Sequence, residues 1–161
     1  MFPGNRPSKV IFALVSSAGF NGDLKRNPFK FAHYNLSDIR FVVDGQTVPG
    51  PAQKLDFDAT KGRKFIQSYL SLYANQSRGG NYGPGGITPE LFANGHAIFV
   101  YNLDPVINLT DTKYINLKRQ SNVRLELNFS KPLEETVTVL IIAEYETFFE
   151  IDSPRNVVMG D

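Results

Sequence analysis

Two histidines are the residues of this 161-residue chain best suited to acid–base or metal chemistry. His33 and His96 lie far apart in the sequence, and neither belongs to an HxH or HExxH motif. A metal-binding cupin, the all-β alternative, would need a cluster of histidines with a carboxylate, and the chain has no cysteine that could serve as a further ligand. We therefore predict that each is a partly buried histidine of a strand, hydrogen-bonded to a backbone group.

Asp56 and Asp58 resemble the opening of a calcium-binding loop. The EF-hand pattern requires Gly at its sixth position and Glu at its twelfth, where this chain has Lys61 and Gln67. We expect the two carboxylates to be solvated or to cap a helix, and a loose cation site remains the alternative.

A glycine-rich stretch, RGGNYGPGG at residues 78–86, could suggest a phosphate-binding loop. It is not followed by Gly-Lys-Ser/Thr, and its spacing is not that of a dinucleotide-binding fingerprint. A single RGG is weak evidence for RNA binding. The stretch is predicted to be a surface loop.

The remaining polar motifs indicate no catalytic centre. The chain has no cysteine nucleophile and no G-x-S-x-G elbow, and Glu134–Glu135 is expected to be a solvated pair in a turn. Of four N-glycosylation motifs, the one at Asn128 falls inside a predicted strand, so chance composition explains them better than modification. We expect no enzymatic activity, no cofactor and no metal.

Composition narrows the class of protein further. Apolar residues make up 42% of the chain and charged residues 20%, as in ordinary globular proteins, and 13 Phe and 7 Tyr favour β structure. The net charge of +1 without a basic run argues against nucleic acid as a specific partner. No apolar run approaches the ~20 residues that span a bilayer, and the N-terminal residues lack a signal-peptide pattern. We expect a soluble protein, not exported by its own sequence, with no membrane partner.

Alternating apolar and polar residues predict the strands that position these side chains. Lys9–Val15 begins the series, and residues 122–130 place Val123, Leu125 and Leu127 on one face. Asp44-Gly45 predicts a type I′ hairpin turn, and Pro49 and Pro51 are expected to end that pairing. The other predicted strands cover residues 29–34, 96–103, 114–118 and 136–151, the last as one long strand.

Helical periodicity appears in the middle of the chain. Apolar residues recur at three- and four-residue spacing in residues 61–74, which predicts one amphipathic helix. A shorter helix is predicted at residues 89–93, with Thr88 as N-cap, Pro89 at its first position and Gly95 as C-cap. The pattern as a whole indicates one all-β domain over residues 1–161, a sandwich or barrel of about eight strands, with flexible ends at about 1–8 and 153–161.

Several motifs together resemble one protein family. The stretch GFNGDLKRNPFKFAHYNLSDIRFVVDGQTVPG, the ANG turn before a strand and the strand NVRLELNFS with its KPL turn are similar to the second jelly roll of hexon-like major capsid proteins. These are the double jelly-roll proteins of Polinton/Maverick elements and adintovirus-like genomes. The resemblance runs from about residue 9 to residue 157. It implies an antiparallel eight-stranded jelly-roll sandwich with one or two short helices in insertions between strands.

The resemblance also implies a function. Proteins of that family carry a first jelly roll before the second, trimerise into pseudo-hexagonal capsomers and form the virion shell, which assembles inside the host cell. Side chains expected at contacts between copies are Arg78, Asn81, Tyr82, Arg155 and Asn156. The alternative is a non-enzymatic jelly-roll module that binds carbohydrate or peptide through its loops, with Tyr82 as the first place to look.

Overall fold

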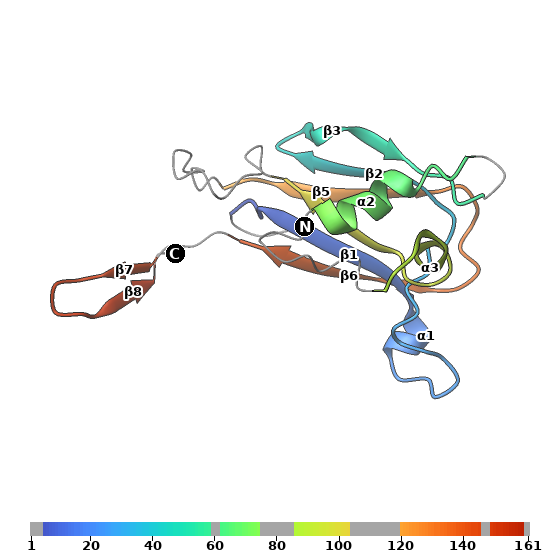
Figure 1. The fold of residues 1–161 in the computed structure, drawn as a ribbon, viewed down its shortest axis with the longest axis horizontal. Coiled ribbons are helices and arrows are strands. Elements are labelled where there is room, and N and C mark those ends of the chain that lie inside the picture. The colour runs from blue at the N-terminus through green and yellow to red at the C-terminus, as the bar shows by residue number, and fades with distance from the viewer. Residues whose placement is uncertain (1–4, 59–61, 75–85, 104–119, 146–148, 160–161) are drawn as a thin grey trace.

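Two antiparallel three-stranded sheets form the body of the protein (Figure 1). The structure is a computed structural model and describes residues 5–58, 62–74, 86–103, 120–145 and 149–159. One sheet has the order β4-β1-β6 and the other the order β3-β2-β5. Their strands are β1 (Lys9–Ser16), β2 (Leu36–Val43), β3 (Gln46–Lys54), β4 (Ile98–Asn102), β5 (Val123–Phe129) and β6 (Val137–Glu144).

The remaining elements lie around these sheets. The helices are α1 (Ser17–Phe20), α2 (Ile66–Ala74) and α3 (Pro89–Ala93), of which α2 packs on β4 and contacts α3. The strands β7 (Phe149–Ile151) and β8 (Val157–Met159) form a separate two-stranded sheet. We call residues 149–159 the ribbon. In Figure 1 the ribbon projects from one end of the molecule, whereas α1 and the loop that follows it project from the opposite end.

A single apolar core fills the space between the two sheets. From β1, the alternate residues Val10, Phe12 and Leu14 point inward and are fully buried. The Phe12 ring stacks on Phe99 of β4 at 4.9 Å and meets the edge of Phe41, from β2 of the opposite sheet, at 6.4 Å. The contact between Phe12 and Phe41 joins the two sheets, and the shared core confirms an all-β sandwich. The two main sheets contain three strands each within the described residues, fewer than the eight strands expected of the sandwich.

The hairpin between β2 and β3 is confirmed, but the predicted role of its prolines is wrong. Asp44 and Gly45 adopt φ values of 51° and 85°, the left-handed pair that a type I′ turn requires. The pairing does not end at Pro49. Residues 49–52 form a bulge away from β2, and beyond it Gln53 again pairs with Ile39. Since β3 is an edge strand in the described sheet, the prolines break no hydrogen bond to a strand beyond it.

Both predicted helices form, with different ends. The longer one begins at Ile66 and not at residue 61, because Gly62 and Arg63 adopt positive φ values that no α-helix accommodates. The shorter one has the predicted bounds, and Thr88 Oγ1 accepts a hydrogen bond from the Leu91 N–H. Its C-cap is Asn94, and Gly95, predicted for that role, follows it with a φ of 103°.

The strand predicted at residues 29–34 does not form. Residues 29–34 form a loop, because Asn27 Oδ1 accepts the Phe29 N–H and Tyr34 and Asn35 both adopt positive φ. Phe31 alone makes an isolated bridge, to His96.

The predicted long strand at residues 136–151 divides into β6 and β7. Its first part ends at Glu144, opposite Lys9, because β1 begins there and offers no backbone partner beyond that point. In the N-terminal part, residues 17–20 form the single-turn helix α1, which the sequence analysis did not predict. The strand predicted at residues 114–118 lies outside the described residues.

Candidate interaction surfaces

The two histidine-bearing segments meet through their backbones. The Phe31 N–H donates to the Gly95 carbonyl at 2.8 Å, and the Ala97 N–H donates to the Phe31 carbonyl at 2.9 Å. The imidazole of His33 stacks on Phe57 at 4.0 Å, and its Nδ1 accepts the Asn35 N–H at 2.9 Å. Burial lowers the pKa of His33 and favours the neutral ring.

The prediction for the histidines is therefore confirmed only in part. His33 is half-buried and bonded to a backbone group, as expected, but it lies in a loop. His96 is exposed, which contradicts the expected burial. Within the described residues, no three His, Asp or Glu side chains are grouped as metal ligands would be.

Asp56 acts locally, through its neighbour's backbone. Its Oδ1 accepts the Asp58 N–H at 3.0 Å, an arrangement that shapes a turn after β3. Asp58 is exposed, as expected of a solvated acid, whereas Asp56 is partly buried and bonds a neighbouring backbone group.

Glu135 is not the solvated residue that was predicted. Its Oε2 accepts hydrogen bonds from Ser16 at 2.9 Å and from Arg26 at 2.5 Å, and its Oε1 accepts the Tyr34 hydroxyl at 3.1 Å. The Ser16 bond, followed by those from Tyr34 and Arg26, lowers the pKa of Glu135. Burial, then the bond to Glu135, raises the pKa of Tyr34 to about 12. No sequence spacing links these residues, which meet only because the β5–β6 turn folds beside the end of β1.

This polar cluster holds the segment after β1 in place. Residues 17–30, which we call the α1 loop, are joined to the β5–β6 turn by Arg26 and are folded by their own backbone hydrogen bonds. The Asp23 N–H donates to the Ala18 carbonyl at 3.0 Å, and the Lys30 N–H donates to the Asn27 carbonyl at 3.2 Å. Arg26 and these backbone hydrogen bonds therefore give the projecting α1 loop a defined structure.

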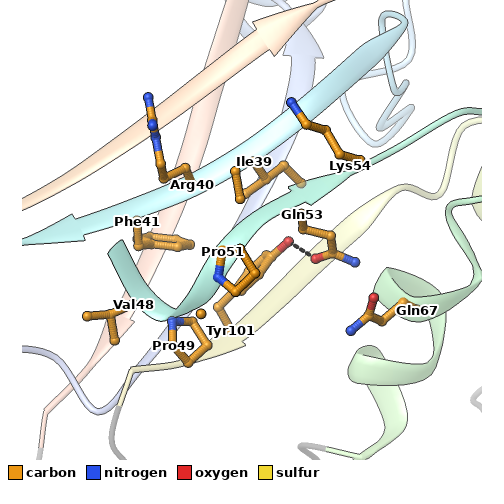
Figure 2. A pocket seen from close by; sticks show the side chains of 12 residues that line it. Ile39, Arg40, Phe41, Val48, Pro49, Pro51, Gln53, Lys54, Gln67 and Tyr101 are labelled. Carbon is orange, nitrogen blue, oxygen red and sulfur yellow. Dashed lines mark hydrogen bonds between the residues drawn. The ribbon is translucent and has the colours of Figure 1, made fainter. Parts of the chain in front are cut away.

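A hollow of about 500 Å³ lies where β3 bulges away from β2 (Figure 2). Pro49 and Pro51 form part of its wall beside Tyr101, whose hydroxyl is hydrogen-bonded to Gln53 Oε1. Gln53 Nε2 in turn donates to Ser68 Oγ at 2.9 Å, and burial raises the pKa of Tyr101. These polar groups are bonded to one another, but Gln67 and Arg40 also line the hollow, and the Nε of Arg40 is buried without a hydrogen-bond partner among the described residues.

The side chains predicted at contacts between copies divide into two groups. Arg78, Asn81 and Tyr82, with most of the glycine-rich stretch, lie outside the described residues. Arg155 and Asn156 form the turn of the ribbon. The backbone N–H and Nδ2 of Asn156 donate to the two carboxylate oxygens of Asp152, at 2.7 and 2.9 Å, and the Arg155 N–H donates to the Asp152 carbonyl at 2.9 Å.

Exposed apolar side chains are frequent on the β5–β6 turn, β6 and the ribbon, and sequence reasoning missed them. Of the thirteen large hydrophobic residues found exposed among the described residues, eight lie between positions 133 and 157. They are Leu133, Val139, Ile141, Ile142, Tyr145, Phe149, Ile151 and Val157. Exposed apolar side chains that share one face, as Phe149, Ile151 and Val157 do, are typical of a surface that binds another protein.

The pairing register explains why these side chains are uncovered. Val139 and Ile141 of β6 lie opposite Leu14 and Phe12, so they share the core-facing side of the sheet, yet each is about two-fifths exposed. In the ribbon, Ile151 lies opposite Val157, and Phe149 shares their face. Phe149, Ile151 and Val157 are between 59% and 67% exposed. The clue in the sequence was the middle of residues 136–151, which is apolar on both faces.

A second apolar group lies on the α1 loop. Phe20 is 53% exposed, Phe29 is 73% exposed and Leu24 is fully exposed. Lys25 and Lys30 are exposed beside them. The two ends of the molecule in Figure 1 therefore both carry apolar side chains that the described part of the chain leaves uncovered.

Comparison with known proteins gives one relative and no assigned function. The chain is 31% identical over 162 residues to "Uncharacterized protein F54H12.2" of Caenorhabditis elegans. The match covers 99% of this chain but only 38% of the relative's length. No family model and no solved structure match the chain. Among the described residues, no helix is long and apolar enough to cross a membrane.

Proposed function

We propose that this chain is a structural domain of a virus-type capsid protein, which self-associates into capsomers and a protein shell. The observation that carries the proposal is the concentration of exposed apolar side chains on β6 and the ribbon. Leaving large side chains such as Phe149 and Ile151 in water costs free energy, and a partner that covers them would recover it. The resemblance to the second jelly roll of hexon-like capsid proteins supports the same conclusion.

The jelly-roll connectivity belongs to this proposal. The two described sheets and their face-to-face core support a sandwich. An eight-stranded jelly roll would need further strands in the two sheets. The edge position of β6 in the described sheet, with its core-facing side chains partly exposed, is compatible with an additional covering element.

The proposed partners are further copies of the chain and a preceding jelly-roll domain in a trimeric capsomer, located in the virion. A near-neutral net charge of +1 supports close packing of copies, because they repel one another only weakly. An isolated second jelly roll lacks half of the capsomer contacts, so this chain alone is expected to be monomeric or to associate weakly.

The test is the mass, by light scattering, of the full native product including any upstream domain, followed by electron microscopy. The proposal requires trimers and shell-like particles. A product that stays monomeric at high concentration and forms no shell would overturn it.

The second candidate is a non-enzymatic module that binds carbohydrate or peptide. Within the described residues, the hollow beside Tyr101 is the feature that favours it, with Gln67 on its wall. A glycan array read with the wild-type chain, Gln67→Ala and Tyr82→Ala tests it. Saturable binding lost in either variant would replace the capsid proposal by this one.

A further inference from the structure

His33 uses its side chain as the hydrogen-bond acceptor of a tight turn. Its Nδ1 accepts the Asn35 N–H at 2.9 Å, and its carbonyl accepts the Leu36 N–H at 2.8 Å. We call residues 33–36 the histidine turn. Within it, Tyr34 and Asn35 adopt φ values of 46° and 56°, in the left-handed region that side chains other than glycine occupy at a cost in free energy. The bond to Nδ1 therefore helps to hold a backbone conformation that would otherwise relax.

The same arrangement recurs in the described chain with acceptors of another kind. Asp23, Asn27 and Asp56 each accept, through Oδ1, the N–H of the residue two positions later, at 2.9, 2.9 and 3.0 Å. Asparagine and ionised aspartate keep this acceptor at any pH above about 5. Imidazole titrates near neutrality, and its protonated form carries a donor on both nitrogens and has no acceptor. Among these four turns, the histidine turn is the one that loses its acceptor in mildly acidic solution.

The histidine turn also links three segments of the fold. The Asn35 carbonyl accepts the Ser130 N–H, just after β5, at 2.9 Å. The Tyr34 hydroxyl donates to Glu135 on the β5–β6 turn at 3.1 Å, and Glu135 accepts a further bond from Arg26 of the α1 loop. A change in the backbone of residues 34 and 35 is therefore passed directly to the β5–β6 turn and, through it, to the α1 loop.

We infer that protonation of His33 opens the histidine turn and loosens its hold on the β5–β6 turn and the α1 loop, which makes it an acid-sensitive switch. A proton on Nδ1 would face the Asn35 N–H, so two donors would meet and the bond would break. Burial acts in the same direction, because it lowers the pKa of His33 from 6.5 and favours the neutral ring. The closed turn is thus fully favoured above pH 6.5 and loses stability as the pH falls from there through the lowered pKa.

Charged groups lie around the ring but are not bonded to it within the described residues. The imidazole stacks on Phe57 at 4.0 Å. The titratable or charged side chains on the surrounding segments are Asp56 and Asp58 beside Phe57, His96 at the bridge to Phe31, Lys30 in the preceding loop, and Arg26 and Glu135 beyond the Tyr34 hydroxyl. The pKa of Glu135 is lowered, chiefly by the bond from Ser16, so this carboxylate stays ionised while His33 titrates. The switch therefore depends on the proton of His33.

The switch regulates the surface at this end of the molecule. The α1 loop carries the exposed side chains Phe20, Leu24 and Phe29, and their arrangement depends on the contacts that the histidine turn supports. The inference does not rest on the proposed self-association, because it concerns contacts within one chain.

Nitrogen-15 NMR of the imidazoles in the wild-type chain tests the first step. At about pH 7.5 we expect the proton of His33 on Nε2, with Nδ1 as the unprotonated acceptor, and a titration midpoint below 6.5. A proton on Nδ1 at that pH, or a midpoint at or above 6.5, overturns the inference.

Hydrogen–deuterium exchange at about pH 7.5 and about pH 5, corrected for the intrinsic rate at each pH, tests the second step. In the wild-type chain, protection of the amides of the histidine turn and of the α1 loop should fall about fivefold, the net worth of one hydrogen bond. His33→Asn keeps an Oδ1 acceptor of the kind that Asn27 supplies and does not titrate, so its protection should be the same at both pH values. His96→Asn should behave like the wild type.

Three outcomes of the exchange experiment overturn the switch. Equal protection of the wild-type turn at both pH values shows that protonation does not open it. An equal loss in His33→Asn assigns the effect to another group. Protection of the turn as high as that of β1 shows that the turn opens only when the whole domain unfolds.

Discussion

The strand β5 and the ribbon have the same kind of sequence and opposite surroundings. In β5, Leu125 and Leu127 alternate with Glu126 and Asn128, and the apolar face packs against the core. In the ribbon, Phe149 and Ile151 alternate with acidic residues in the same way, and the apolar face is exposed.

This difference between β5 and the ribbon shows which structural features an alternating sequence pattern determines. It fixes which face of a strand is apolar, because successive side chains point to opposite sides. It does not determine whether the chain itself supplies the cover. The face of β5 is covered by the opposite sheet, whereas we propose that the face of the ribbon is covered by another copy.

The largest expected effect comes from truncating an aromatic residue in each region. Phe41→Ala should lower the free energy of unfolding by about 3–5 kcal/mol, because it leaves a cavity beside Phe12 in the core. Phe149→Ala in the ribbon should change it by no more than about 0.5 kcal/mol. Urea unfolding of both variants measures the contrast. Similar losses in the two variants would show that the ribbon is part of the folded core.

Introducing a charge sharpens the same comparison. Leu127→Asp places a carboxylate against the core cluster and should cost about 2–4 kcal/mol. Ile151→Asp should leave the thermal midpoint of the isolated chain nearly unchanged and weaken its self-association. Calorimetry measures the thermal midpoint, and sedimentation velocity measures self-association. An intact midpoint for Leu127→Asp would contradict the burial of the β5 face.

A smaller effect is expected where the α1 loop joins the body. Tyr34→Phe removes the hydroxyl that donates to Glu135 and should cost about 0.5–1.5 kcal/mol in unfolding free energy. The matched control is Tyr145→Phe at an exposed position, which should be neutral. If the two variants are equally stable, the polar cluster does not stabilise the loop.

The smallest effect is a dependence of stability on pH. Burial lowers the pKa of His33 in the folded state from its ordinary value of 6.5, so the unfolded chain binds the proton more tightly. The contribution of neutral His33 is complete above pH 6.5 and is lost as the pH falls from there through the lowered pKa. His33→Phe should flatten this part of the stability profile measured by urea unfolding, and His96→Phe should not. A profile unchanged by His33→Phe would exclude this explanation.

Local sequence signals predicted the parts of the fold that depend on local chemistry. Asp44-Gly45 specified its turn because both positions accept a positive φ, and Thr88-Pro89 specified the start of α3 through a side-chain cap. The β5 face followed from simple alternation.

Features that depend on distant neighbours could not be predicted in this way. Glu135 gains its partners from residues about a hundred positions earlier in the chain. The pairing of β3 resumes beyond Pro51 because the bulge faces the open edge of the sheet. β6 ends at Glu144 because β1 begins opposite it, although the apolar pattern of the sequence continues.

Hydrogen–deuterium exchange at rising protein concentration tests the central claim, that another copy covers the ribbon. The backbone amides of residues 149–151 should become more protected as concentration rises, while β1 stays equally protected throughout. Protection of the ribbon that does not rise with concentration would contradict the account.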